Sequence, residues 1–253
     1  MMCRKLFLVA FLALMVVGLS RVSPAIAALS VGAEIGGNFI GTLEIEGSTR
    51  TRRVRLPKDT TVDPALLSGL TVEYYFVDKG VLRYDWPDWM KNFSIALDVT
   101  HNQLAFGHQT SEFISTDPDW GTLSLPEFNG YVLTFSLLFK YRFPLIKQPD
   151  FPDGRLFLYV GVGPGISYSY LEANNNIVGN DSAVGHGTAT SPTLVAESGI
   201  SLFVVKDVSI DLFFRYRYSA PRYEFNVGVC GAPLYVNFDN NSYNAALRIA
   251  YHF

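Results

Sequence analysis

The last twelve residues of the chain, Ser242–Phe253, read SYNAALRIAYHF. Odd-numbered positions hold Tyr, Ala, Leu, Ile, Tyr and Phe, whereas even-numbered positions hold Ser, Asn, Ala, Arg, Ala and His. Because successive side chains of a strand point to opposite faces, this segment predicts a strand with one apolar face and one polar or small face. A half-buried strand of a soluble protein shows the same alternation, so the rest of the chain must decide the fold class.

Seven further segments alternate in the same way, and none of the chain after its first thirty residues contains an apolar run long enough for a membrane-spanning helix. The segments are 31–39, 69–76, 93–100, 131–143, 155–170, 194–204 and 208–218. Eight long strands, each apolar on one face, are compatible with a soluble sandwich or with a membrane barrel.

Charges favour the barrel, because they fall on the face opposite to the apolar series in every strand. Inside a narrow barrel such charges need partners. We therefore expect a charge network in the lumen. Its predicted members are Glu34, Glu73, Asp98, Lys140, Arg142, Glu197, Asp211, Arg215, Arg217 and Arg248.

Aromatic residues and connection lengths favour the barrel as well. Tyr and Phe crowd the strand ends, as in Tyr141, Phe143, Tyr216 and Tyr218, and aromatic girdles are typical of outer-membrane barrels. Long connections alternate with shorter ones. The outer loops are expected at 42–66, 103–128, 171–192 and 219–240, and the inner turns at 78–91, 144–154 and 205–207. The prediction is an all-β fold: a transmembrane, antiparallel, up-and-down β-barrel of eight strands in the cell outer membrane.

The N-terminus predicts export. Arg4 and Lys5 precede fourteen residues without a charged side chain, and Ala25-Ile26-Ala27 supplies the small residues of a cleavage site. This order is typical of a secretory signal peptide. We expect residues 1–27 to be removed and residues 28–253 to form a single barrel domain.

Composition excludes several classes of function. After removal of the signal, 17 basic residues face 23 acidic ones, a net charge of −6, which gives no reason to expect nucleic-acid binding. Cys230 is the single cysteine of the mature chain and cannot form an internal disulfide. No zinc-type cluster is present, so neither a metal nor another cofactor is expected.

At this point the chain resembles the small bacterial outer-membrane barrels: the OmpA transmembrane barrel, OmpX, the opacity-like and the OmpW-like proteins. Tyr251-His252-Phe253, with Leu247 and Ile249 in register, looks like their C-terminal recognition strand, and the glycine-rich 159–166 looks like one of their strands. The resemblance implies that Tyr251 and Phe253 are the assembly signal, and that the barrel-assembly machinery and periplasmic chaperones are partners during biogenesis. We expect no peptidoglycan-binding domain after the barrel, so the full OmpA arrangement is not predicted.

Two local features admit more than one interpretation. Gly161, Gly163 and Gly165 face the lumen; they allow close packing and curvature, which we favour, or make room for arginines or a ligand. Arg50, Arg52, Arg53 and Arg55 fall in the first outer loop. They form a solvated hairpin, which we favour, and are compatible with contact to lipopolysaccharide phosphates in the outer-membrane lipid.

Three functions remain open. The interpretation we favour is a structural or adhesin-like surface barrel whose lumen is plugged by charge, because eight strands leave room only for side chains. The alternative is a small-solute porin of OmpW-like type. A lipid A-modifying enzyme ranks last: Asp181, Ser182 and His186 share a predicted loop, but spacing in a loop does not supply catalytic geometry. No extracellular partner can be named.

Overall fold

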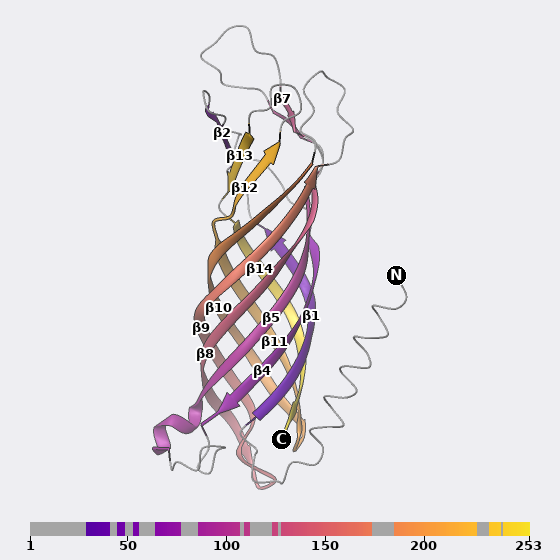
Figure 1. The fold of residues 1–253 in the computed structure, drawn as a ribbon. Coiled ribbons are helices and arrows are strands. Elements are labelled where there is room, and N and C mark those ends of the chain that lie inside the picture. Colours follow the sequence, from indigo (N-terminus) through magenta and orange to yellow (C-terminus); the bar gives the residue numbers. More distant parts are fainter. Residues whose placement is uncertain are drawn as a thin grey trace.

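The structure, a computed structural model, describes residues 29–40, 45–48, 53–55, 64–76, 86–106, 109–111, 123–125, 128–173, 185–226, 233–238 and 240–253. Eight strands close into one barrel in the order β1-β14-β11-β10-β9-β8-β5-β4 (Figure 1). Their bounds are β1 Leu29–Ile40, β4 Ala65–Tyr75, β5 Phe93–Phe106, β8 Phe128–Gln148, β9 Phe151–Ala173, β10 Gly185–Val205, β11 Val208–Ser219 and β14 Asn240–His252. The predicted fold class and strand number are confirmed.

All neighbouring strands are antiparallel, and the last strand closes the barrel by pairing with both β1 and β11. Backbone hydrogen bonds extend this pairing to the last two residues of the chain. The N–H of His252 donates to the carbonyl of Asp207 (2.8 Å), and the N–H of Phe253 donates to the carbonyl of Leu29 (2.9 Å). Both edges of the terminal strand are therefore paired up to the end of the chain.

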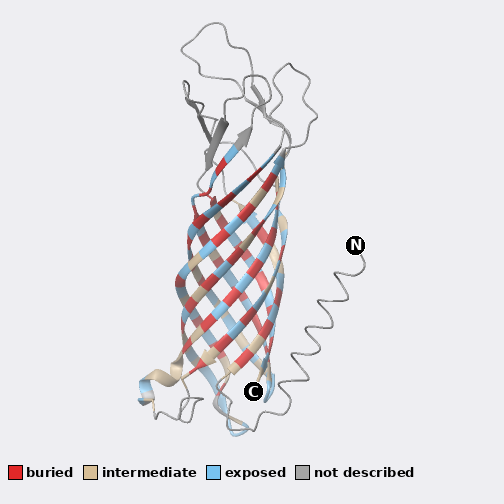
Figure 2. Ribbon diagram, viewed as in Figure 1, coloured by how far each residue is buried: buried red, intermediate tan, exposed pale blue. Residues whose placement is uncertain are grey.

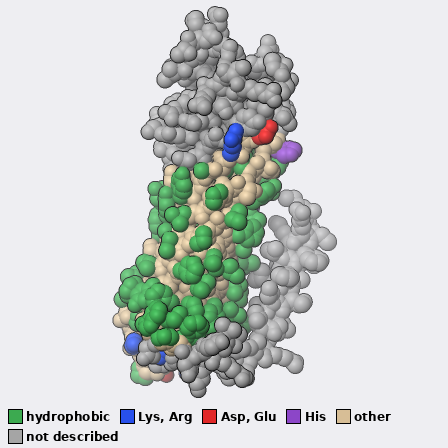
Figure 3. Space-filling model, turned by 60° about the vertical axis from the view of Figure 1, so that its left-hand side comes forward, with side chains coloured by type: hydrophobic (Ala, Val, Ile, Leu, Met, Phe, Trp, Pro, Cys, Tyr) green, Lys and Arg blue, Asp and Glu red, His purple; other side chains and the backbone are tan. Residues whose placement is uncertain are grey.

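Burial alternates along the strands and gives the barrel a checkered pattern (Figure 2). The exposed positions carry the apolar series read from the sequence, such as Ile35, Leu97, Phe135, Ile166 and Leu247. Together these side chains form a broad apolar belt around the barrel (Figure 3). A surface of this kind is unstable in water and fits the hydrocarbon of a bilayer.

Two connections are shorter than the sequence indicated. The inner turn expected at 144–154 is only two residues long, because β8 runs to Gln148 and β9 starts at Phe151. Pro144 lies inside β8, where the pairing register shifts: a proline removes one ladder hydrogen bond, and a bulge absorbs the loss without ending the strand.

The expected outer loop 171–192 is shorter as well, because β9 continues to Ala173 and β10 begins at Gly185. The outward positions of this part of β10 are polar, including Thr188 and Thr190. An alternation of apolar and polar residues is required only where a strand faces lipid. Beyond the apolar belt the alternation is lost, so the sequence does not indicate that the strand continues.

Further strands lie at the end of the barrel that carries the long connections, which we call the outer end (Figure 1). The strands β12 Arg222–Asn226, β13 Pro233–Phe238, β2 Ile45–Ser48 and β3 Arg53–Arg55 pair in that order. A second, two-stranded sheet joins β6 Gln109–Ser111 to β7 Leu123–Leu125. The opposite, inner end carries the short 3-10 helix η2, Asp88–Asn92. The helical part of the described chain includes nothing long and apolar enough to cross a membrane.

Candidate functional site

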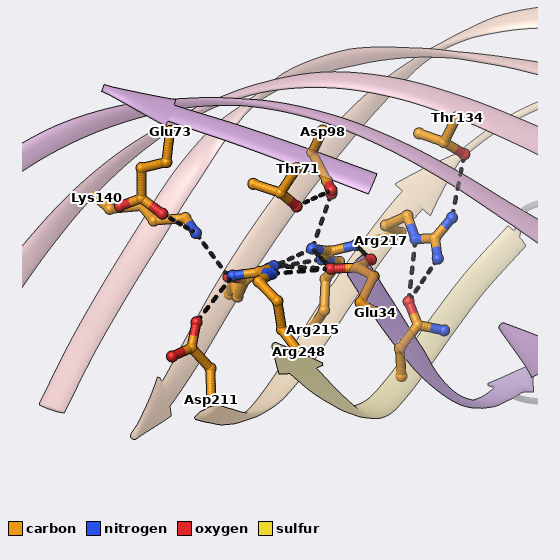
Figure 4. A network of polar contacts seen from close by, with 12 residues as sticks. Glu34, Thr71, Glu73, Asp98, Thr134, Lys140, Asp211, Arg215, Arg217 and Arg248 are labelled. Atoms are coloured by element: carbon orange, nitrogen blue, oxygen red, sulfur yellow. Dashed lines mark hydrogen bonds and ion pairs between the residues drawn. The ribbon is translucent and has the colours of Figure 1, made fainter. Parts of the chain in front are cut away.

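Inward-facing charges meet inside the barrel around the guanidinium of Arg215 (Figure 4). Its Nη1 lies 2.9 Å from Glu34 Oε1 and its Nη2 lies 2.8 Å from Asp98 Oδ2. Its Nε donates to Glu197 Oε2 at 2.8 Å. Because Arg215 is only 1% exposed, these carboxylates replace water as its partners.

Arg248 and Lys140 extend the cluster around the barrel. Arg248 lies directly opposite Glu34 on the neighbouring strand, and its Nη2 is 2.8 Å from Glu34 Oε2 and 3.2 Å from Glu197 Oε1. Its Nη1 is 3.6 Å from Asp211 Oδ2. Lys140 Nζ is 3.2 Å from Glu73 Oε2 and 3.1 Å from Glu197 Oε1.

We call these residues the charged layer. It comprises Glu34, Glu73, Asp98, Lys140, Glu197, Asp211, Arg215 and Arg248. Every barrel strand except β9 contributes to it. The layer is thus a continuous web across the lumen, with Glu197 shared by three cations.

Arg142 and Arg217, which the sequence placed in the same network, have other contacts. Within the described residues, neither guanidinium forms an ion pair at the distances seen in the charged layer. Arg217 is bound by neutral side chains, and Arg142 lies over the rings of Tyr75 and Phe157, with its guanidinium carbon 3.9 and 5.3 Å from their centroids. Periodicity identified the inward face of both arginines but not their partners.

Above the charged layer, toward the outer end, the lumen is filled by a hydroxyl–amide layer organised by Arg217. Its Nε and Nη2 donate to Asn244 Oδ1 (3.0 and 2.7 Å), and its Nη1 donates to Asn102 Oδ1 (3.3 Å) and Thr134 Oγ1 (3.1 Å). Hydroxyl hydrogen bonds then lead from Thr134 to Ser167 and on to Thr193, and Asn244 Nδ2 donates a hydrogen bond to Asn38 Oδ1. Every barrel strand except β4 contributes a side chain to this layer.

Below the charged layer, toward the inner end, aromatic rings fill the lumen. His252 stacks on Tyr75 (centroids 5.6 Å apart) and lies 4.6 Å from the ring of Phe203, which packs against Phe157. With Arg142 over two of these rings, they form the inner ring cluster, held by cation–π and edge-to-face contacts.

This cluster was missed in the sequence, because its aromatic residues stand next to apolar residues of the outward face. Tyr75 lies between Tyr74 and Phe76, and Phe157 lies between Leu156 and Leu158. In such runs an inward ring is not distinguished by residue type. Only the strict period of two, counted from the middle of each strand, identifies which ring points inward.

The lumen glycines have different neighbours. A Cβ on Gly163 would lie 1.8 Å from the carbonyl oxygen of Leu137, and a Cβ on Gly165 would lie 2.7 Å from that of Phe135. These two positions serve close strand packing, as expected. At Gly161, a Cβ would meet Lys140 Cγ at 2.8 Å, so the missing side chain leaves space for the stem of a charged-layer lysine.

Several sequence-based predictions fall outside the described part of the chain. Residues 1–27, Arg50, Arg52 and Cys230 belong there, as do Asp181 and Ser182 of the considered catalytic triple; Arg53 and Arg55 are described only as the backbone of β3. His186, the third member of the triple, is a strand residue of β10 rather than a loop residue. The described residues include no group of three metal-ligating side chains.

Comparison with models of protein families finds no match, and comparison with curated proteins finds none either. Solved structures do match. The outer membrane protein OprG from Pseudomonas aeruginosa is 16% identical, covers 90% of this chain and 100% of its own, and superposes with a TM-score of 0.56. The chain has the fold of the small outer-membrane β-barrels.

Two other outer-membrane structures of this kind align over a similar length. Neisserial surface protein A is 13% identical over 89% of this chain and 97% of its own, with a TM-score of 0.44. The N-terminal β-barrel domain of OprF from Pseudomonas aeruginosa is 13% identical over 88% and 97%, with a TM-score of 0.40. The fold together with the apolar belt places this outer-membrane barrel in a bilayer.

A folded barrel of this type should resist both SDS and carbonate. We expect an unheated sample to migrate differently from a boiled sample on SDS gels, because the closed ladder of β1 to β14 has no free edge at which unfolding can begin. We also expect the protein to stay with carbonate-washed outer membranes. Recovery of the folded chain from the soluble periplasm would contradict the assignment.

Proposed function

We propose that this outer-membrane barrel is closed to ions and solutes, and that it acts as a structural or surface-interaction protein rather than as a porin. The charged layer is the observation that carries the proposal. Its residues reach into the lumen from seven of the eight barrel strands and contact one another at 2.5–3.6 Å. Side chains paired in this way fill the space along the barrel axis.

The adjoining layers support the same conclusion. The hydroxyl–amide layer above is buried, with Asn38, Asn102, Thr134 and Asn244 each no more than 3% exposed. At the outer end, Tyr223 of β12 is fully buried and its hydroxyl donates to Ser169 Oγ at 2.6 Å. A permeating ion would have to displace the Tyr223–Ser169 contact, the hydroxyl–amide layer and the charged layer in turn. Such barriers are typical of a filled eight-stranded barrel.

Electrical recording tests the proposal directly. The purified barrel, inserted into planar bilayers, is expected to give no regular stepwise conductance above that of the bare membrane. Insertion has to be verified in parallel, by protease protection of the same protein in vesicles. A steady, large conductance from verified insertions would overturn the closed-lumen proposal and favour the porin alternative.

We further propose that the terminal strand is read during assembly, as the resemblance to known barrels implies. The side chain of Phe253 packs on Tyr251, with ring centroids 4.9 Å apart, at the lipid-facing edge of β14. Deleting Phe253, or replacing it with Asp, should lower the amount of barrel in the outer membrane severalfold and raise periplasmic degradation.

Phe253→Tyr is the matched control, because it keeps an aromatic ring at the same position and should assemble normally. Since the Phe253 N–H also bonds to Leu29, stability of the refolded Asp variant in detergent separates an assembly defect from an unstable barrel. Unchanged membrane levels of the Asp variant at low expression would contradict the role in assembly.

A further inference from the structure

Four rings stack side by side across four neighbouring strands, on the outward face of the barrel near its outer end. They are His101 on β5, Tyr131 on β8, Tyr170 on β9 and His186 on β10, and we call them the ring ladder. Adjacent centroids are 5.7, 5.6 and 5.7 Å apart, and the ring planes lie within 28° of parallel. The ladder therefore has two tyrosines at its centre and a histidine at each end.

The ladder borders the apolar belt. On β8 the outward side chains that follow toward the membrane centre are Leu133 and Phe135, and on β9 they are Tyr168 and Ile166. Both histidines are exposed, and they alternate along their strands with inward-facing residues such as Thr100 and Gly187. A histidine, an acidic side chain and a basic side chain are visible above the green belt in Figure 3. Lipids whose chains cover the belt must place their headgroups at this level.

Stacking also fixes what the histidines present to those headgroups. Because one face of each imidazole lies against a tyrosine, its edge, which carries both nitrogens, is directed away from the partner ring. In either tautomer each imidazole offers an N–H donor along this edge, and an ionised acceptor forms the stronger hydrogen bonds with such donors. Phosphate is the anionic group of lipids best suited to accept them.

We propose that the ring ladder binds the phosphate groups of a phosphorylated glycolipid in the outer leaflet. The proposal rests on the outer-membrane assignment and is separate from the arginines of the first outer loop. The glycolipid is favoured over a phospholipid because the ladder lies at the end that carries the long outer connections, where the outer leaflet meets the barrel.

The two ends of the ladder should not bind equally. His186 faces Glu172 directly across the β9–β10 pairing, so a carboxylate competes there with the lipid phosphate. His101 faces Ser68 of β4 and Leu133 of β8, and neither of these is charged. The His101 end is therefore the stronger phosphate site.

Native mass spectrometry of the barrel, released from nanodiscs that contain lipid A, tests the proposal. The double substitution His101→Leu and His186→Leu, which removes the N–H donors, should lower the fraction of barrel that retains lipid A about tenfold, the size expected for lost charge-assisted hydrogen bonds. His101→Leu alone should account for the larger part of this loss. His252→Gln, which alters a ring inside the barrel, should leave retention unchanged.

Further arms identify the ligand and the role of stacking. Dephosphorylated lipid A should bind the unaltered barrel as weakly as lipid A binds the double variant. Tyr131→Leu should weaken retention, whereas Tyr131→Phe should preserve it because the stack remains. Equal retention of lipid A and its dephosphorylated form would overturn the proposal, as would stronger retention of phosphatidylglycerol or competition by millimolar inorganic phosphate alone. Heat-modifiability of each variant reports folding separately.

Discussion

Arg215→Ala should lower the free energy of unfolding by about 3–5 kcal/mol, as for removal of one partner of a buried ion pair. The substitution leaves Glu34, Asp98 and Glu197 facing one another without their shared cation. It also removes the side chain at the centre of the charged layer (Figure 4). Urea-induced unfolding of the barrel in detergent micelles or lipid vesicles measures the first effect, and planar-bilayer recording should show a new conductance.

Arg155→Ala is the matched control. Arg155 lies at the inner rim, and donates to the carbonyl of Phe203 and to the side chain of Gln148 in partly exposed surroundings. Its loss should cost less than about 1 kcal/mol and should open no conductance. If Arg215→Ala were as stable as Arg155→Ala, the charges of the lumen would have to be solvated independently, and the closed-lumen proposal would be wrong.

Gly163→Ala should destabilise the barrel by roughly 3 kcal/mol, near the upper end of the usual cost of overpacking. The added Cβ would lie 1.8 Å from the carbonyl oxygen of Leu137 and 2.8 Å from its carbonyl carbon. Both atoms belong to the backbone of β8, so no rotation of a side chain relieves the clash. Refolding yield into lipid vesicles, read as the heat-modifiable fraction, should fall accordingly.

Gly37→Ala tests whether the effect comes from backbone proximity rather than from loss of a glycine. A Cβ at Gly37 would have as its nearest neighbours two ring carbons of Phe39, both at 3.1 Å. That ring is an exposed, flexible side chain and can move, so the refolding yield should stay near that of the unaltered chain. Equal yields for both variants would show that β8 and β9 adjust their pairing freely.

The strand faces could be predicted from the sequence because lipid and lumen impose opposite requirements on alternate residues. This requirement is strict at Ile249 and Arg248, which are neighbours in sequence and lie on opposite sides of the barrel wall. The requirement ends beyond the bilayer, where Thr188 and Thr190 face water. In that region the strand bounds predicted from the sequence were wrong.

Partners within the lumen were beyond the reach of the sequence for a different reason. Which side chains meet depends on the stagger between strands, and periodicity does not contain the stagger. Glu34 and Arg215 are 181 residues apart in sequence and form an ion pair, whereas Arg217, two residues further along, binds only neutral groups. A stagger different by two residues keeps the same face inward and would bring different side chains together.

The arginines that flank the charged layer have an electrical consequence. The layer contains five acids and three bases, a net charge of −2. Arg217 lies two residues toward the outer end from Arg215, and Arg142 lies two residues toward the inner end from Lys140. Along the barrel axis the charges therefore run +1, −2, +1. Such an arrangement has no net charge and little axial dipole. An electric field along the barrel pulls the two flanking arginines in one direction and the charged layer in the other, so the net force nearly vanishes, although each single charge would feel about 2.3 kcal/mol per 100 mV across a full membrane. The charges of the described lumen are in this sense balanced against voltage.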